Sequence, residues 1–585
     1  MYVLMFASRW ISSLALLALA SLGSLAGSTS GCNSRRVTVR PTPTSPDART
    51  TPRMAEGPPT VRLYFLVDLD GYFEPCGCNS RPLGGIDRLA RYIRAEQPRA
   101  PENMLIAVGD LLFRDPTMDE RMVYQETRKA ESLVQILDQL GLAAYAPGPS
   151  DYVRGAEERT RILANQRASA LAANVDPATQ GYRPGLIRTV NGHKIGLVGV
   201  SDFRPTSETP APAGAPATTD PTEAARAAVA RLRSEGAELV VVLASVTRRD
   251  AVSIARNVPG VDFVIVAREE SNTPPPPERV GRAYVLSAPN QGKFVGVLDL
   301  YLRAPGAISD ASESSAVAVR ASLDRRIREL QQRLEAWRRD PSVDPAAVAQ
   351  QSARLVTLQS ERAAANGEPE PPASGSYFRA RATEISPDLP KESTIEQSIA
   401  RYFSTVNEHN REAYASLQPP PPLRGQPRYV GGEECRSCHE AAFAIWERTP
   451  HSRAYWTLDV LHKNFNLSCV GCHVTGYQRP GGSEVVQNDG LRDVQCETCH
   501  GPGSAHIAAS TDAQRRATII RNPPQAFCAT QCHTPEHSDH FDYAQYLPRI
   551  LGPGHGYPED SADAGGVRLS APIIANGQNT DAGAH

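Results

Sequence analysis

The feature that most constrains this chain is a short pattern, Cys-x-x-Cys-His, that recurs after residue 430. Three copies are present: CRSCH at 435–439, CVGCH at 469–473 and CETCH at 496–500. With 11 cysteines and 13 histidines among 585 residues, chance would supply on the order of 0.005 copies. Two thiols at this spacing can reach the two vinyl groups of one porphyrin while the adjacent imidazole turns onto the iron. Each copy therefore predicts covalent attachment of one haem c.

A fourth copy, CATQCH at 528–533, has one extra residue between its cysteines. The longer loop must bulge to present both sulfurs, so loading of this site is open, although two further histidines nearby favour it. Zinc bound by cysteine pairs is the alternative, but zinc does not require a histidine after every second cysteine. We expect three to four haems c, held by Cys435, Cys438, His439, Cys469, Cys472, His473, Cys496, Cys499, His500, Cys528, Cys532 and His533.

Each iron also needs a sixth ligand if it is to stay low-spin and move electrons with little reorganisation. His451 and His506 rank first as distal ligands, because small residues flank them and leave room for a porphyrin face. A surface histidine is the alternative for any of them. The further candidates are His462, His537, His540 and His555.

Residues 431–545 resemble the tetrahaem c-type cytochrome family of nitrifying bacteria, whose members are periplasmic electron carriers. The likeness lies in GGEECRSCHEAAFAIWERTPHSRAYWTL, CVGCHVTGYQRPGG and VQCETCHGPGSAH. It implies bis-histidine ligation at most irons, with His451 and His506 at matching positions. The stretched fourth motif departs from the family pattern.

The N-terminal segment predicts export. Residues 1–32 combine Arg9, an apolar run and small residues, and the run is too short and too rich in Ser and Gly for a membrane span. Its end resembles a bacterial lipoprotein signal, which implies lipidation of Cys32, although Thr29 replaces the usual Leu. An ordinary cleavage site nearby, with Cys32 left free, is the alternative. Residues 33–60 are rich in Pro, Thr and Arg and predict a disordered tether.

Between residues 61 and 303, short β-branched runs alternate with helical stretches, which predicts an α/β layered domain. This part resembles calcineurin-like metallophosphoesterases, particularly periplasmic nucleotidases, in VDLDGYFEPCGC, GGIDRLARYI, LIAVGDLLF, GPSDYVRG, AANVD and KIGLVGVSD. The resemblance implies a four-layer sandwich with two metal ions that bridge a phosphate and activate water.

Most metal ligands of that family are missing here. Asp68 and Asp110 match the pattern, but Asp70 stands where a histidine belongs. Pro149, Ser150 and Ser245 stand at further ligand positions, and Gly148 and Asp151 alone remain of Gly-Asn-His-Asp. Ala267, Arg268, Glu269 and Glu270 replace the Gly-His-x-His ending. We therefore expect an inactive domain with no catalytic residues. The alternative is an all-oxygen site for Ca²⁺ or Mg²⁺ formed by Asp68, Asp70, Asp110 and Asp151.

Cys76 and Cys78 leave several interpretations open. In an oxidising compartment the pair could form a strained disulfide, pair elsewhere, or bind a soft metal such as Cu(I).

Residues 312–416 predict a helical hairpin and a connecting helix. Leu323, Ile327, Leu330, Leu334 and Trp337 form a heptad seam that DPSVDP at 340–345 interrupts. A spacer and a dimerising arm both fit this pattern. A Pro-rich linker at 417–428 precedes the multihaem domain at 429–556, which we expect to be mostly α-helical and irregular, and residues 557–585 predict a disordered tail.

The composition excludes one class of partner. The 62 basic and 64 acidic residues nearly balance, so nothing indicates nucleic-acid binding. We expect a multidomain, exported electron carrier that is a periplasmic or cell-envelope lipoprotein of a Gram-negative bacterium. Its expected partners are redox proteins, and its lipid would attach it to the membrane. The oligomeric state is open. The alternatives are a haem enzyme that acts on a small nitrogen or sulfur compound and a redox-linked phosphoesterase.

Overall fold

A computed structural model describes residues 57–75, 81–176, 178–179, 181–204, 212–267, 273–339, 345–366, 369–486, 489–534, 537–538, 541–552 and 555. Pro58–His585 forms one compact unit. Several predicted features lie outside the described residues: the export signal with Cys32, most of the tether, the tail, and Cys76, Cys78, Arg268, Glu269, Glu270 and His540.

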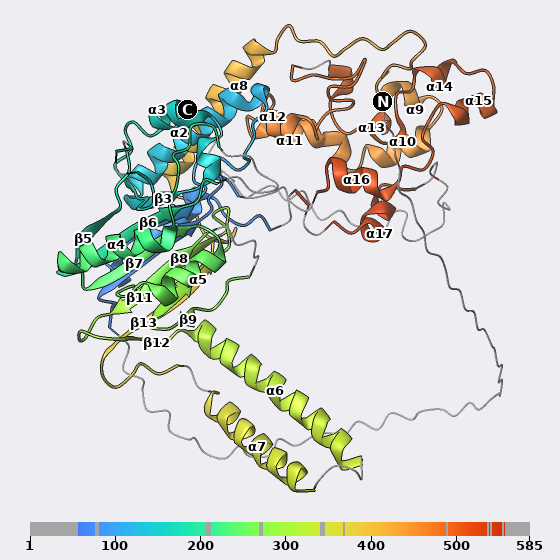
Figure 1. The fold of residues 1–585 in the computed structure, drawn as a ribbon. Helices are drawn as coiled ribbons and strands as arrows, with labels where there is room; N and C mark the ends of the chain where they lie inside the picture. Colours follow the sequence, from blue (N-terminus) through green and yellow to red (C-terminus); the bar gives the residue numbers. More distant parts are fainter. Residues whose placement is uncertain are drawn as a thin grey trace, which may run out of the picture. The chain divides into compact units, whose positions relative to one another are not determined.

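Two mixed sheets face each other in the first part of the chain (Figure 1). The larger has the strand order β12 (Ile308–Asp310), β13 (Ser376–Glu384), β11 (Phe294–Tyr301), β1 (Val61–Val67), β2 (Asn103–Gly109), β3 (Leu142–Pro147) and β4 (Ser169–Ala170). The smaller has the order β5 (Gly185–Val190), β6 (His193–Ser201), β7 (Leu239–Ser245), β8 (Phe263–Val266), β10 (Ala283–Leu286) and β9 (Glu278–Val280). Strands β1, β2 and β3 run parallel, as do β6, β7 and β8.

Helices cover the outer face of each sheet. Residues of α1 (Ile86–Glu96), α2 (Val123–Gln139) and α8 (Ser393–Ala413) share one buried cluster with the larger sheet. Residues of α4 (Pro221–Ser234) and α5 (Arg248–Asn257) share another with the smaller sheet. A third cluster, with Phe65, Ile106, Leu243 and Ile265, lies between the sheets. The four-layer sandwich that the resemblance implied is therefore confirmed, and α3 (Gly155–Ile162) follows β3 at its edge.

The larger sheet extends beyond the expected boundary at residue 303. Strand β13 pairs antiparallel with β11 along its whole length, from Tyr301 opposite Tyr377 to Phe294 opposite Glu384. Phe378 and Ala380 complete the layer between the sheets. The sequence reading overlooked this strand because two long helices separate it from the rest of the sheet.

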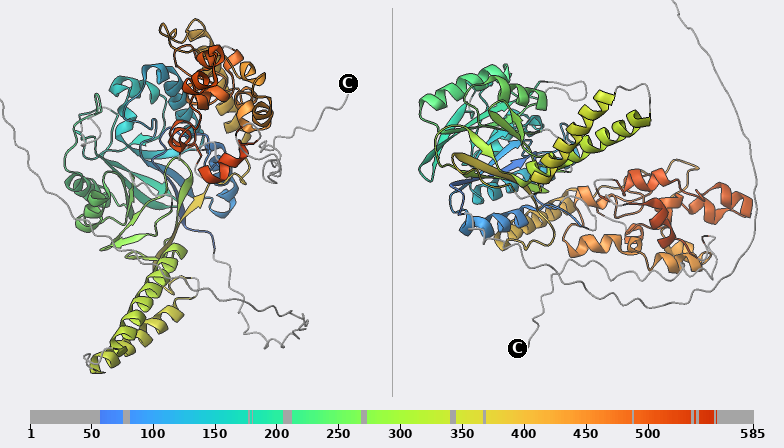
Figure 2. Two further views of the ribbon diagram at one scale, coloured as in Figure 1. Left: turned by 90° about the vertical axis from the view of Figure 1, so that its right-hand side faces the viewer. Right: turned by 90° about the horizontal axis from the view of Figure 1, so that it is seen from below.

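Those helices, α6 (Glu313–Arg339) and α7 (Pro345–Ala364), form a hairpin that projects from the sheets (Figure 2). Leu323, Leu330 and Leu334 pack with Leu358. The Arg362 Nε donates to Asp324 Oδ1 at 2.7 Å, which joins the last turn of α7 to the first half of α6, as an antiparallel pair requires. Among the helices of the described ranges, none combines the length and apolarity needed to cross a membrane.

The region after residue 430 consists of short helices and loops (Figure 1). Its small apolar cluster contains Tyr455, Leu458, Val470 and Val474. The helices are α9 (Glu433–Arg436), α10 (Glu440–Trp446), α11 (Ala454–Val460), α12 (Leu467–Val470), α13 (Cys496–His500), α14 (Ser504–Ala508), α15 (Asp512–Ala517), α16 (Gln525–Gln531) and α17 (Tyr543–Tyr546).

Candidate functional site

The histidine of the first motif faces the histidine of α14. The ring centroids of His439 and His506 lie 6.1 Å apart, with an interplanar angle of 27°. Iron–nitrogen bonds of about 2 Å, with about 1 Å from each nitrogen to its ring centre, would set two axial imidazoles about 6 Å apart. This pair therefore fits the two faces of one haem iron.

A second pair joins the fourth motif to the segment before α11. The ring centroids of His451 and His533 are 6.2 Å apart. Burial is the main cause that lowers the pKa of His451 to about 4, and the neighbouring His533 is the smaller one. Burial also lowers the pKa of His533. Both rings are therefore neutral at pH 7, which is the form that binds a metal.

The third motif lies close to His555. Burial lowers the pKa of His555, and the neighbouring imidazoles of His500 and His439 lower it further. His555 therefore lies near the histidines of the third and the first motif.

Three of these rings are oriented by backbone carbonyls. The Nδ1 atoms of His473, His500 and His506 lie 2.5, 2.7 and 2.9 Å from the carbonyl oxygens of Ala454, Ile520 and Arg515. A carbonyl only accepts, so each Nδ1 carries the proton and each Nε2 is left for iron.

His473 of the second motif differs from the others. Its nearest polar neighbours are the Ala454 carbonyl oxygen and the Thr457 hydroxyl, the latter 3.4 Å from Nδ1. Within the described ranges no histidine ring is paired with it, and His462 and His537 join neither of the two ring pairs.

The motifs also approach one another through their cysteines. The side chains of Cys435 and Cys496 are neighbours, as are those of Cys472 and Cys532. The first and third motifs therefore lie together, as do the second and fourth.

Three carboxylates gather at the carboxyl ends of β1 and β2. Oxygens of Asp68, Asp70 and Asp110 lie within 4.8 Å of one another. The backbone of Asp68 and Asp70 has positive φ, 39° and 54°, which costs free energy outside glycine. Burial, with the charges of Asp68 and Asp110, raises the pKa of Asp70 to about 9.

Protein donors already engage this cluster. The Ser150 backbone N–H and hydroxyl donate to the two carboxylate oxygens of Asp110, at 2.7 and 3.1 Å. The Asp110 N–H donates to Asp68 Oδ1 at 3.1 Å. Ser150, which stands where the resemblance places a histidine, therefore donates to both carboxylate oxygens of Asp110.

Asp151 does not join the cluster, contrary to the four-carboxylate alternative. Its Oδ1 accepts the N–H groups of Leu111 and Leu112 at 2.9 and 2.7 Å, and its Oδ2 that of Gly148 at 3.3 Å. It is 1% exposed and ties the loop after β2 to the loop after β3. Its role in the structure is that of a buried backbone clamp.

A polar contact that the sequence did not reveal joins the phosphoesterase-like region to the segment before the second motif. The side chain of Gln125, on α2, accepts the N–H of Leu467 at 3.0 Å and donates to the Ser468 hydroxyl at 3.0 Å. Asn410, on α8, donates to the Phe465 carbonyl at 2.8 Å. Gln125 and Asn410 are each 1% exposed. An isolated Gln or Asn in a helix carries no sequence signal of such a role.

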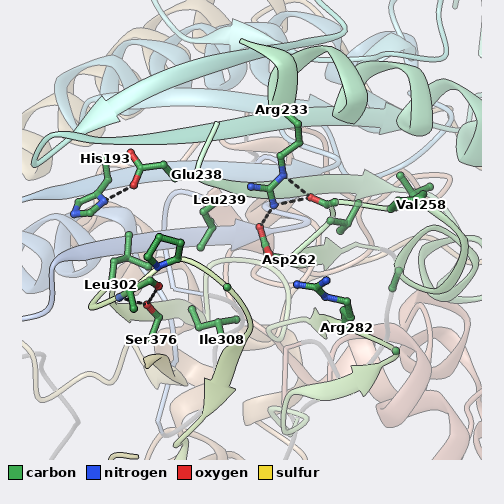
Figure 3. A pocket seen from close by; sticks show the side chains of 18 of the residues that line it. His193, Arg233, Glu238, Leu239, Val258, Asp262, Arg282, Leu302, Ile308 and Ser376 are labelled. Carbon is green, nitrogen blue, oxygen red and sulfur yellow. Dashed lines mark hydrogen bonds and ion pairs between the residues drawn. The ribbon is translucent and has the colours of Figure 1, made fainter. Parts of the chain in front are cut away.

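A cavity of about 800 Å³ lies apart from both sites, at the amino ends of β7 and β8 (Figure 3). Its two carboxylates are paired within its wall: Asp262 with Arg233 at 2.5 Å, and Glu238 with His193 at 2.8 Å. None of the haem motifs or clustered aspartates lines it.

Comparisons with known proteins support the same division of the chain. Residues 434–501 match the sequence model of the family described as cytochrome c554 and c-prime. Cytochrome c-554 of Nitrosomonas europaea is 33% identical over 91 residues, 13% of this chain and 39% of that protein. A probable 5'-nucleotidase of Treponema pallidum is 21% identical over 188 residues, 31% of this chain and 30% of that protein. The chain thus spans well under half the length of each of these relatives.

Solved structures resemble the chain at lower identity. The sulfate thiohydrolase SoxB of Thermus thermophilus has a TM-score of 0.43 at 15% identity and covers 61% of this chain and 62% of that one. A 5'-nucleotidase precursor, also of Thermus thermophilus, has a TM-score of 0.41 at 18% identity, covering 68% and 67%.

Both resemblances inferred from the sequence are confirmed. The part after residue 430 is similar to cytochrome c554, which supports a multihaem c-type cytochrome region. The first part is similar to calcineurin-like nucleotidases.

Proposed function

We propose that this chain is an exported electron carrier whose haem-binding region relays electrons through three or four haems c, and whose phosphoesterase-like region no longer hydrolyses phosphate. Two ring pairs carry the proposal. The motif histidine His439 lies about 6 Å from His506, and the motif histidine His533 lies about 6 Å from His451. Haem iron held between two imidazoles exchanges one electron without binding substrate.

The protein's own residues prepare these positions. The carbonyls of Ile520 and Arg515 hold the tautomer and orientation of His500 and His506. Burial keeps His451 and His533 neutral. The closeness of Cys435 to Cys496, and of Cys472 to Cys532, supports two close pairs of haems, which would favour electron transfer within each pair.

Loss of hydrolysis is supported by the replaced ligands. A site for two divalent ions needs several imidazoles and an open position for water. Ser245 stands where the resemblance places a histidine, and Ser150, at another such position, donates to Asp110. We propose that the region serves as a platform, because Gln125 and Asn410 grip the segment that leads into the second motif.

Export, a lipid on Cys32 and redox partners at the cell envelope belong to the same proposal. They rest on the export signal at residues 1–32 and on the haem motifs of the same chain. A bound Ca²⁺ or Mg²⁺ at Asp68, Asp70 and Asp110 is the alternative for the phosphoesterase-like region.

The test uses the full-length protein. Anaerobic titration should show every haem reduced and reoxidised reversibly, and a chromogenic phosphodiester should not be cleaved even with added Mn²⁺. Steady phosphodiester turnover above that of a D110N control would mean that the ligand set still binds metal, and would overturn the proposal for this region.

His473 favours a second candidate function. Because no second imidazole faces it within the described ranges, the second haem could bind a small nitrogen or sulfur compound and act on it. Spectra in which all the iron is low-spin, with no change on adding nitrite, hydroxylamine or sulfite, would exclude this candidate.

A further inference from the structure

Glu497 is a buried carboxylate inside a haem motif, and the haem chemistry proposed above gives it no role. It is the first spacer residue of CETCH, on α13, and it is 2% exposed. An ionised side chain at such a position is costly unless hydrogen bonds compensate it. The surroundings of Glu497 therefore need an explanation.

Backbone N–H groups from two other segments supply those hydrogen bonds. Glu497 Oε2 accepts the N–H of Gly431 at 2.8 Å, and Oε1 accepts that of Gly503 at 2.6 Å. The Val430 N–H donates to both oxygens, at 3.0 and 3.1 Å. Three N–H groups therefore stabilise the charged form of one carboxylate.

These segments carry ligands of the first haem. Gly431 lies four residues before Cys435, and Gly503 lies three residues before the distal candidate His506. Glu497 itself stands next to Cys496 and three residues before His500. One side chain thus links the first motif, the third motif and the helix that carries His506.

Neighbouring side chains reinforce the same junction. The Gln495 Oε1 accepts the Gly432 N–H at 2.6 Å. Arg428 and Ser504 exchange two hydrogen bonds, at 2.8 and 3.2 Å. Gly431 has φ +91°, and a Cβ there would lie 2.9 Å from the Gly490 carbonyl oxygen, so the approach to Glu497 needs a glycine. The junction is built around the carboxylate.

The charge of Glu497 acts on both sites. Glu497 stands next to Cys496 of the third motif, and it accepts the N–H groups of Val430 and Gly431, which lead into Cys435 of the first motif. In a low-dielectric interior, a fixed negative charge also favours ferric over ferrous iron.

We propose that Glu497 is a positioning residue that fixes the first and third haems as one unit and whose buried negative charge lowers their reduction potentials. The inference rests on the proposed haem function. A purely structural carboxylate would hold the fold but leave the potentials to other groups.

The test compares three full-length proteins: wild type, E497Q, and E434Q as a matched control. Glu434 is also a glutamate next to a motif cysteine, Cys435, but its side chain is exposed. Covalent haem is counted first, and each protein is then titrated anaerobically with optical detection.

We expect E497Q to keep its haem content and to shift part of the haem titration to more positive potential, with E434Q close to wild type. Superimposable titrations of loaded E497Q and wild type would overturn the inference. Wild type without covalent haem would instead overturn the proposed function itself, so the two failures are distinguishable.

If E497Q does not accumulate, E497D provides the second measurement. It keeps the charge but shortens the reach by one methylene, so the hydrogen bonds to Gly431 and Gly503 cannot both persist. We expect a part of the low-spin electron paramagnetic resonance signal to become high-spin. A spectrum identical to wild type would show that Glu497 does not position His506.

Discussion

The rings of His439 and His506 face each other at 6.1 Å, although one belongs to the first haem motif and the other follows the third. Two imidazoles at this separation and 27° inclination fit the two axial positions of one iron. In the proposed ligation the motifs are interleaved, because His506 follows the third motif and faces the histidine of the first.

Replacing His506 should leave the first haem attached but change its spin state. In H506A the thioether bonds and His439 remain, so we expect unchanged haem content and the loss of one low-spin signal to a high-spin one. Electron paramagnetic resonance of the ferric protein measures this. H462A is the matched control, since His462 joins neither ring pair, and it should retain the wild-type spectrum. A low-spin spectrum in H506A would mean that another residue binds this iron.

The stretched fourth motif should be loaded. His533 faces His451 at 6.2 Å, so the longer loop still delivers its imidazole to a partner. The double variant C528A/C532A should lose the mass of one haem relative to wild type in denaturing mass spectrometry. An unchanged mass would show that CATQCH does not attach haem, and three haems would then remain.

Asp70 should make the phosphoesterase-like region less stable as the pH rises. Burial and two neighbouring carboxylates raise its pKa to about 9, so between roughly pH 4 and pH 9 the folded state binds more protons than the unfolded state. The free energy of unfolding therefore falls with rising pH across this window. D70N removes the titration, so it should be more stable than wild type at pH 8 and flatten the pH dependence, as measured by thermal unfolding.

The same experiment tests the alternative of a bound cation. A Ca²⁺ or Mg²⁺ ion at the three aspartates would keep Asp70 ionised and raise the unfolding temperature of wild type but not of D70N. We expect added Ca²⁺ or Mg²⁺ to change neither.

Gln125 should anchor the haem-binding region to its platform. Q125A would remove the acceptor of the part-buried Leu467 N–H and the donor to the Ser468 hydroxyl, at a cost of about 1 kcal/mol for each lost hydrogen bond. We expect faster proteolysis between the two regions and a lower midpoint of urea unfolding. Q135A, exposed on the same helix, is the control and should behave as wild type. Equal proteolysis of Q125A and Q135A would contradict the anchoring role.

The sequence predicted the chemistry that depends on local spacing. The Cys-x-x-Cys-His motifs predict covalent haem attachment, and the alternation of strands and helices predicts the layered sandwich. Both signals can be recognised because each lies within a few consecutive residues. The preference for His451 and His506 as distal ligands remains a prediction, which their ring pairing supports.

The features that the sequence did not predict depend on residues far apart in the chain. The sequence did not show which histidine meets which motif, and it gave no sign that β13 returns to β11 after a long helical hairpin. By its position in the sequence Asp151 resembled a metal ligand, but its carboxylate accepts hydrogen bonds from three backbone N–H groups. Gln125 and Glu497 belong to the same class, since a polar residue does not reveal its burial without the fold.

Denaturing mass spectrometry of the full-length protein, expressed with a c-type haem maturation system, tests the central claim most directly. The account predicts a polypeptide mass increased by three or four covalently attached haems, with no loss of haem on acidic acetone extraction. A polypeptide with its eight motif cysteines unmodified, or with zinc in place of haem iron in the native protein, would contradict it.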